Sequence, residues 1–258
     1  MATTFHALSE GESHFAIPSE NHKTAIVTGA SSGIGLGIAN SLMARGYNVV
    51  ANSRGITQSR MLKPNENLLL VDGDIGAEET AAKLVDVALQ EFGQIDLLVN
   101  NAGIFIPKPF TEFTRNEFER MISTNLFGFF FATQRAFTQM RKQKSGHIVT
   151  MTTSLADQPI SGVPAALTNL TKGGLQSVTK ALAIEFAGQG IRVNAIAPGV
   201  VDTPMHAPES HEFLKQLHPI QRLAAISEIV EALLYLDSAA FVTGEVLHVD
   251  GGAHAGRW

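Results

Sequence analysis

The sequence predicts a doubly wound α/β protein, with a parallel seven-stranded sheet and helices on both of its faces. Short apolar runs alternate with helical periods along nearly the whole chain. Strands and helices that alternate in this way form right-handed crossover units and therefore a parallel sheet covered on both sides. A glycine-rich turn also follows the first apolar run and opens a helical stretch. We expect one nucleotide-binding domain at residues 23–258, after a flexible lead at residues 1–22 that is rich in Ser, Glu and His.

Each predicted strand is a short apolar or β-branched run bounded by Gly, Asn, Asp or Pro. In chain order these runs are Thr24–Thr28, Asn48–Asn52, Asn67–Val71, Leu97–Asn100, His147–Met151, Arg192–Ala197 and Glu245–Val249. The stretches with helical periodicity are Gly33–Arg45, Glu78–Phe92, Thr114–Gln143, Pro164–Gly188 and Ser227–Ser238. The longest irregular stretch, Thr203–Leu223, follows a predicted strand and contains three Pro and three His. Long loops at this edge of a sheet usually carry function.

Composition excludes several classes of protein. The chain has 258 residues, of which 45% are apolar, enough for one sizeable core. Its net charge of −5 gives no basic surface for nucleic acid. The absence of cysteine excludes disulfides, thiolate catalysis and cysteine-zinc sites, and we predict no metal site. The polar start does not resemble a secretory signal, and no run reaches the roughly 18 apolar residues of a membrane span. We therefore expect a cytoplasmic protein without a membrane partner.

The glycine-rich turn predicts a dinucleotide site. Residues 28–35 have the sequence T-G-A-S-S-G-I-G, between the first strand and the first helix. Glycines allow a tight turn in which backbone N–H groups approach a pyrophosphate, and the helix N-terminus adds partial positive charge. Many ordinary turns contain such glycines, but the strand–turn–helix context favours a nucleotide.

The end of the second strand indicates which nucleotide. An acidic residue at this point would bind the ribose 2′-hydroxyl of NAD(H), whereas the chain has Asn52, Ser53 and Arg54. A guanidinium can hold a 2′-phosphate through paired hydrogen bonds, so we expect NADP(H) rather than NAD(H). The alternative is that Arg54 is an ordinary solvated surface residue.

Together, these and later motifs resemble the short-chain dehydrogenase/reductase family, over about residues 23–252. The motifs in family order are T-G-A-S-S-G-I-G, Asp74-Ile75, Asn100-Asn101-Ala102-Gly103, Asn125, Ser154, Lys172, Pro198-Gly199-Val200-Val201-Asp202-Thr203, Val242-Thr243-Gly244 and Val249-Asp250-Gly251-Gly252. Each motif alone is common, but the ordered set is specific. The resemblance implies a Rossmann-type fold and an oxidoreductase that acts on a small organic carbonyl, alcohol or related acceptor.

The resemblance also implies roles for individual residues. Those that would hold the cofactor are Gly29, Ser31, Ser32, Gly33, Ile34 and Gly35 at the pyrophosphate, Ser53 and Arg54 at the 2′-phosphate, Asp74 and Ile75 at the adenine, Asn101, Ala102 and Gly103 at the adenosine ribose, Lys172 at the nicotinamide ribose, and Pro198, Gly199, Val201 and Thr203 near the carboxamide. The implied catalytic residues are Asn125, which anchors a water, Ser154, which binds the substrate carbonyl, and Lys172. The implied pocket lining is Phe105, Ile106, Leu155, Gln158, Ile160 and the loop 203–223.

Three of these residues have simpler interpretations. Asn125 could cap or stitch a helix, Asp74 could cap the turn that follows it, and Ser154 could be an ordinary hydroxyl at a strand end. The spacing of Ser154 is also unusual, because the family serine lies thirteen residues before the tyrosine and the separation here is fourteen. One extra residue within Leu155–Pro164 would explain the difference.

The main departure from the family is Thr168, which stands where the motif Tyr-x-x-x-Lys has its tyrosine. In the family the phenol exchanges a proton with the substrate oxygen, and the lysine lowers the phenol's pKa from about 10. A threonine is a much weaker acid and too short to reach the same place. Three explanations remain open: another proton donor (Lys172 through water, Asp157, or one of His206, His211 and His218), a substrate that needs no protein acid, or a protein that binds NADP(H) without turnover. Non-redox chemistry in the same pocket is a further alternative.

Two long helical stretches, Thr114–Gln143 and Pro164–Gly188, carry more Phe, Leu and Ala than one face of a sheet needs. In the family such helices pair across two-fold axes, so we expect a homo-tetramer or homo-dimer. Packing within a single chain would also account for these residues.

Overall fold

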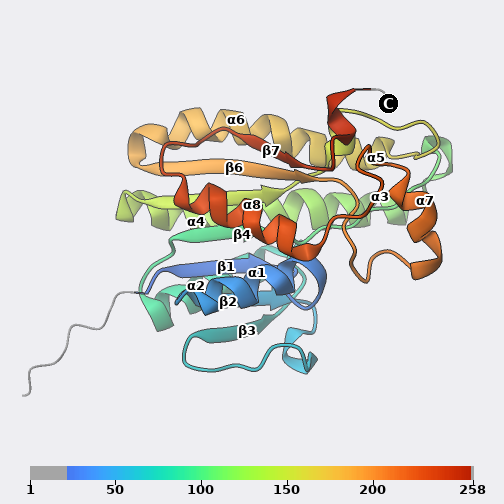
Figure 1. The fold of residues 1–258 in the computed structure, drawn as a ribbon. Helices are drawn as coiled ribbons and strands as arrows, with labels where there is room; N and C mark the ends of the chain where they lie inside the picture. Colours follow the sequence, from blue (N-terminus) through green and yellow to red (C-terminus); the bar gives the residue numbers. More distant parts are fainter. Residues whose placement is uncertain (1–21, 257–258) are drawn as a thin grey trace, which may run out of the picture.

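A seven-stranded parallel sheet forms the centre of the molecule, in the strand order β3-β2-β1-β4-β5-β6-β7 (Figure 1). The computed structural model describes residues 22–256. The strands are β1 (Thr24–Thr28), β2 (Asn48–Ser53), β3 (Leu68–Asp72), β4 (Leu97–Asn100), β5 (Gly146–Met151), β6 (Ile191–Pro198) and β7 (Val246–Val249). The predicted fold class is therefore confirmed, and each strand lies within two residues of its predicted bounds at either end.

Helices cover both faces of this sheet. They are α1 (Gly33–Ala44), α2 (Glu78–Phe92), α3 (Arg115–Ile122), α4 (Gly128–Gln143), α5 (Ala166–Thr168), α6 (Gly174–Phe186), α7 (His211–Lys215) and α8 (Ile226–Ser238). Apolar residues of α1 and α8 form one core with one face of the sheet, and those of α2, α4 and α6 form the other core. Successive β1 residues alternate between them, since Ala25 and Val27 belong to the first core and Ile26 to the second. A strand covered on both sides is continuously apolar, which is why these strands could be recognised in the sequence.

The two long predicted helices are each interrupted, which corrects the expected elements. The first begins after Thr114, whose hydroxyl accepts a hydrogen bond from the Glu117 N–H in a capping box. Wide π-helical turns then separate α3 from α4, at Ser123–Phe127, and α5 from α6, at Asn169–Gly173. Single π turns inside helices often occur at functional positions, and these two contain Asn125 and Lys172.

The predicted irregular stretch 203–223 is also partly helical. It contains a 3-10 turn at Pro208–Ser210 and the short helix α7. Of the predicted flexible lead, residues 1–21 lie outside the described residues. His22 is described and its Nδ1 lies 2.7 Å from the carbonyl oxygen of Gly46.

The described residues contain neither a helix that could cross a membrane nor a cluster of metal-binding side chains. Between residues 22 and 256, none of the helices combines the length and the hydropathy that crossing a bilayer requires. The same residues contain no group of three or more His, Asp or Glu side chains arranged to hold a metal ion.

Candidate active site

A cavity of about 300 Å³ opens at the carboxyl ends of the strands. The strand order reverses between β1 and β4, and open α/β sheets bind ligands at such a switch point. The glycine-rich turn, the segments after β4 and β5, and the loop after β6 all line the cavity. Those predicted site residues that line the cavity are Gly29, Ser32, Gly33, Ile34, Asn101, Ala102, Gly103, Ser154, Lys172, Pro198, Gly199, Val201 and Thr203.

The glycine-rich turn is packed too tightly for larger residues. Gly29 has a φ of +66°, and a Cβ atom there would lie 2.9 Å from the Cα of Ala102. A Cβ on Gly35 would lie 2.3 Å from the carbonyl oxygen of Gly29. The Asn101 amide donates hydrogen bonds to the carbonyls of Thr28, at 2.8 Å, and Gly29, at 3.2 Å. Asn101 therefore ties the turn to the end of β4, a structural role that the sequence did not predict.

The residues predicted at the adenine and the 2′-phosphate do not line the cavity, and neither do two of those predicted at the pyrophosphate. Ser31, Gly35, Ser53, Arg54 and Asp74 do not line it. Arg54 directly follows β2 and is exposed. The Asp74 carboxylate accepts a hydrogen bond from the Gly76 N–H, at 2.9 Å, so it caps the turn after β3. Ile75 is buried beside Gly128, where an added Cβ would lie 2.8 Å from the isoleucine side chain.

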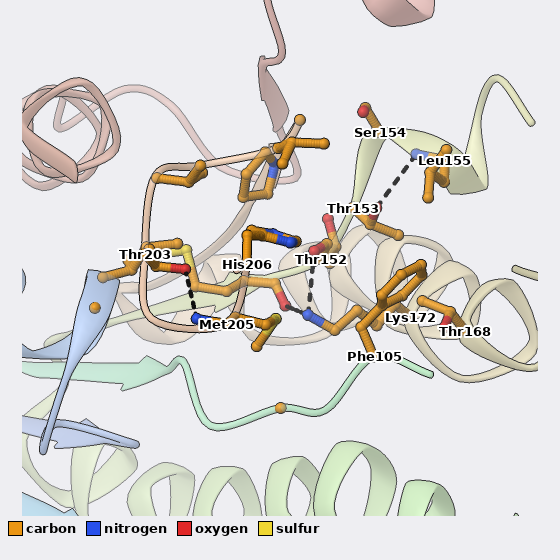
Figure 2. A pocket seen from close by; sticks show the side chains of 18 of the residues that line it. Phe105, Thr152, Thr153, Ser154, Leu155, Thr168, Lys172, Thr203, Met205 and His206 are labelled. Carbon is orange, nitrogen blue, oxygen red and sulfur yellow. Dashed lines mark hydrogen bonds between the residues drawn. The ribbon is translucent and has the colours of Figure 1, made fainter. Parts of the chain in front are cut away.

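Lys172 places its ammonium group inside the cavity (Figure 2). Its Nζ lies 3.4 Å from the carbonyl oxygen of Met151 and 3.3 Å from that of Thr152. Burial lowers the pKa of Lys172 to about 8. Gly103 leaves room for this side chain, because a Cβ there would lie 3.3 Å from Nζ. The lysine is thus held at the end of β5 and remains an acid of moderate strength.

Asn125 supports Lys172 from behind the cavity. Its side-chain oxygen accepts from the Ile104 N–H at 2.9 Å, and its amide donates to the Ile104 carbonyl at 3.1 Å and to the Thr171 hydroxyl at 3.1 Å. Asn125 therefore joins the segment after β4 to the π turn that carries Lys172.

Thr168 lines the cavity from α5 but is only 1% exposed. Its hydroxyl has no hydrogen-bond partner among the described residues. The Thr171 hydroxyl on the next turn, by contrast, donates to main-chain oxygens and accepts from Asn125. Thr168 therefore brings a buried hydroxyl, unpaired among the described residues, to the wall of the cavity.

Three hydroxyl residues, Thr152, Thr153 and Ser154, follow β5 and line the cavity. Ser154 lines the cavity, but in Figure 2 Thr152 and Thr153 lie between it and the Lys172 ammonium. The Thr152 hydroxyl donates to the Ile196 carbonyl at 3.0 Å, and the Thr153 hydroxyl accepts from the Leu155 N–H at 3.3 Å. Both threonines directly follow the predicted strand, a signal that could have identified them.

Apolar side chains form the rest of the wall. Phe105, Leu155 and Ile160 line the cavity as expected, and the predicted loop 203–223 contributes Met205, Leu214 and Leu217. Val163 also lines it and was not predicted. Ile106 and Gln158, which the resemblance implied, are not part of the lining. The sequence placed this loop at the pocket but did not show which of its apolar residues would line it, because that depends on how α7 turns the loop over the site.

Three titratable side chains line the cavity, among the described residues: Lys172, His206 and His218. The His218 ring accepts a hydrogen bond from the Val200 N–H through Nε2, at 2.9 Å, and burial lowers the pKa of this histidine. Asp157, a predicted proton donor, does not line the cavity. Its carboxylate accepts from the Gln176 amide at 2.8 Å and lies 3.0 Å from the His248 ring.

A nucleotide-binding α/β fold with a lysine beside the strand ends defines a dinucleotide-dependent class of protein. A family model described as enoyl-(acyl carrier protein) reductase matches residues 29–254. Among curated proteins, 3beta-hydroxysteroid dehydrogenase 1 of Eggerthella lenta is 35% identical over 243 residues, which span 89% of this chain and 93% of that protein. The chain belongs to the short-chain dehydrogenase/reductase family of oxidoreductases.

Solved structures agree with this assignment. A 3-ketoacyl-(acyl-carrier-protein) reductase of Brucella melitensis, complexed with NADH, is 33% identical with a TM-score of 0.84, over 90% of this chain and 98% of that structure. ElxO with NADP bound is 29% identical with a TM-score of 0.83, over 91% and 100%. A Tyr-to-Phe variant of ElxO with NADPH bound has a TM-score of 0.81 at 30% identity, over 91% and 100%.

Proposed function

We propose that this protein is an NADP(H)-dependent oxidoreductase that interconverts a small organic carbonyl and its alcohol, or reduces a related acceptor, without a tyrosine acid. The observation that carries the proposal is the single cavity of about 300 Å³ in which the glycine-rich turn, Lys172 and an apolar compartment meet. A cofactor bound along the turn would end beside Lys172, next to the space for a substrate.

The residues present fit such a cofactor. The backbone of Gly29–Gly33 would hold the pyrophosphate at the N-terminus of α1. Lys172 would hold the nicotinamide ribose, and Val201 and Thr203 would meet the carboxamide. Asn125 would keep Lys172 in place, through Thr171. When bound, NADP(H) supplies or accepts the hydride, so the protein itself has to bind, orient and exchange one proton.

Selection of NADP(H) would rest on Arg54 and Ser53. Arg54 is exposed at the end of β2, free to meet a 2′-phosphate, and no carboxylate occupies that strand end. The related ElxO structures, with NADP and NADPH, support this preference. The related reductase with NADH shows that the fold also accepts the other cofactor, which would be the weaker ligand here.

Binding of the cofactor would not need the missing phenol. The ElxO variant with phenylalanine in place of a tyrosine still has NADPH bound. What the loss of an acid would affect is the rate, since general acid–base catalysis contributes roughly 10²–10⁴-fold. An active protein with Thr168 therefore needs either another proton donor or a substrate that is already activated.

The cavity favours an uncharged and largely apolar substrate. Phe105, Leu155, Ile160 and Leu214 provide the wall, and none of the arginines between residues 22 and 256 lines it. Hydroxyls of Thr153 or Ser154 would orient the carbonyl. A small cyclic or short-chain carbonyl compound fits these features best.

The first test is NADPH oxidation with a panel of carbonyls, imines and enones, for wild type and Thr168→Tyr in parallel. We expect wild-type turnover on apolar carbonyls, and tight NADPH binding by both proteins. Binding without turnover in either protein would contradict a redox function and leave a nucleotide-binding protein. Product formation at an unchanged cofactor redox state would indicate non-redox chemistry.

We also propose a homo-tetramer or homo-dimer in the cytoplasm. Phe127, Phe130, Leu170 and Ile184 are exposed on the helical layer that contains α4 and α6. A second copy of this chain would remove these side chains from water. Light scattering should give the assembled mass, and Phe130→Glu with Ile184→Glu should reduce it.

A further inference from the structure

Resting on the proposed function, we propose that the imidazole of His206 is the proton donor and acceptor that replaces the missing phenol. His206 lies on the loop after β6 and lines the cavity together with Thr168 and Lys172. In Figure 2 its ring points from the loop into the cavity, toward Thr152 and Thr153. A substrate carbonyl held at the Thr153 hydroxyl would lie on the side of the cavity that the ring faces.

A local turn fixes the main chain of the loop at His206. The His206 N–H donates to the Thr203 carbonyl at 3.0 Å, and the Met205 N–H donates to the Thr203 hydroxyl at 3.4 Å. Thr203 itself lines the cavity, and in the proposed function it meets the nicotinamide carboxamide. The main chain of His206 is therefore held close to the expected nicotinamide site. A group at the edge of the cofactor site is well placed to exchange the substrate proton.

The other titratable groups of the cavity are less suitable. Nε2 of His218 already accepts the Val200 N–H, so this nitrogen is not free to accept a substrate proton. Lys172 is engaged with two main-chain carbonyls and, in the proposed function, with the cofactor. Thr168 is too weak an acid at any physiological pH. His206 alone combines a free imidazole with a place in the cavity, within the described chain.

The charges around His206 suit this role. Burial and the nearby His211 lower the pKa of His206, and Asp202 opposes them. His211 and Asp202 face each other on the same loop, 3.9 Å apart, and Lys172 lies across the cavity. A lowered pKa keeps the imidazole neutral at pH 7, ready to accept a proton, and makes the imidazolium a stronger acid.

The step balances with these groups. In reduction, hydride adds to the carbonyl carbon, the C=O π pair moves to oxygen, and the oxygen takes the Nε2 or Nδ1 proton of the His206 imidazolium. The products are the alcohol, the oxidised cofactor and a neutral imidazole, which regains a proton from solvent. In oxidation, the neutral imidazole removes the hydroxyl proton, the freed electron pair forms the C=O π bond, and hydride leaves the same carbon for the oxidised cofactor.

The test compares His206→Gln with the matched control His211→Gln, on the same loop but outside the cavity lining. We expect His206→Gln to lower kcat by about 10²-fold, with NADPH affinity unchanged. The His206→Gln/Thr168→Tyr double variant should regain most of the lost rate, because the phenol bypasses the histidine. A loop damaged only in structure would not be rescued in this way.

The pH dependence gives a second readout. Wild-type reduction should fall, and oxidation should rise, as pH increases through a value below 6.5. His211→Gln should keep the maximal rate and move both profiles to higher pH, since it removes a group that lowers the pKa of His206. The His206 resonance in NMR titrations of the cofactor-free protein should move in the same direction.

Two results would overturn the role of His206: wild-type kcat in His206→Gln, or a loss that Thr168→Tyr fails to rescue. If wild type and Thr168→Tyr both bind NADPH but neither turns over, the proposed function fails instead. The NMR titration and the binding measurement then still report on the folding of each variant.

Discussion

Asn125 and Ile104 exchange two hydrogen bonds, one in each direction, between the π turn before α4 and the segment after β4. The side-chain oxygen of Asn125 accepts at 2.9 Å and its amide donates at 3.1 Å, so one side chain satisfies both main-chain groups of Ile104. The same amide donates to Thr171, beside Lys172. The segment after β4 and the π turn that contains Lys172 are thus fixed to each other by one residue.

Replacing Asn125 with alanine should therefore affect stability and the site together. The change leaves the N–H and C=O of Ile104 unpaired in a partly buried place, which costs about 1–3 kcal/mol. For a protein of this size, that corresponds to a fall in Tm of about 2–12 °C. Differential scanning calorimetry measures this shift, with Asn40→Ala as an exposed control. An unchanged Tm with unchanged NADPH affinity would contradict the role given to Asn125.

Arg54→Asp should exchange the cofactor preference. The substitution removes the guanidinium expected at the 2′-phosphate and places a carboxylate where it repels that phosphate but can accept from a ribose hydroxyl. We expect the Kd for NADPH to rise about 10²-fold and the Kd for NADH to fall, as measured by fluorescence titration. Arg45→Asp, with the same charge change at the far end of α1, is the control. Equal effects of both substitutions would indicate a general charge effect instead.

Lys172→Met should stabilise the cofactor-free protein while it weakens cofactor binding. Burial lowers the folded-state pKa of Lys172 from 10.5 to about 8, so the folded protein bears a desolvation cost below pH 8. As pH rises from about 8 to 10.5, Lys172 loses its proton in the folded protein while the unfolded chain still binds it, so the desolvation cost is relieved. Methionine removes it at all pH values. We expect a gain of about 1–2 kcal/mol at pH 7, because the side chain is only partly buried and its two carbonyl contacts are also lost.

Urea denaturation at pH 7 and at pH 10 measures the free energy of unfolding of Lys172→Met and of wild type. The advantage of Lys172→Met over wild type should shrink at pH 10. Lys180→Met, at an exposed position of α6 just after the π turn that contains Lys172, should show no such change. A variant that is less stable than wild type at both pH values would contradict the desolvation argument.

The sequence predicted the centre of the sheet well because strands such as β1 and β4 are buried on both faces and largely apolar. Val49–Ala51 and Leu97–Val99 needed no tertiary information to be recognised. The helices were predicted in the right places but without their π turns, since a wide turn is stabilised by contacts such as that of Asn125 with Thr171, far apart in sequence. Likewise, the departure at Thr168 could be seen in the motif, whereas the direction of His206 depends on how the loop after β6 folds back over the cavity.

His147 also depends on contacts between residues far apart in sequence. It should make the stability of the folded protein sensitive to acid. His147 is buried at the start of β5, where Asn194 Nδ2 lies 3.0 Å from its Nε2 and Arg192 Nη2 lies 3.1 Å from its Nδ1. Burial lowers its pKa, the charges of Arg192 and Lys23 lower it further, and Asp237 opposes them. The ring therefore stays neutral in the folded protein while the unfolded chain takes up a proton near pH 6.5. Stability should fall as pH drops below about 6.5.

His147→Gln keeps a polar amide in this cluster but cannot take up the proton. Between pH 7 and pH 5, the free energy of unfolding of His147→Gln should fall by less than that of wild type, whatever its value at pH 7. Urea denaturation followed by circular dichroism measures both values. His22→Gln, which replaces an exposed histidine, should keep the wild-type dependence. If His147→Gln loses as much stability as wild type over this range, the acid sensitivity arises elsewhere, and His218, whose pKa burial also lowers, would be the next residue to replace.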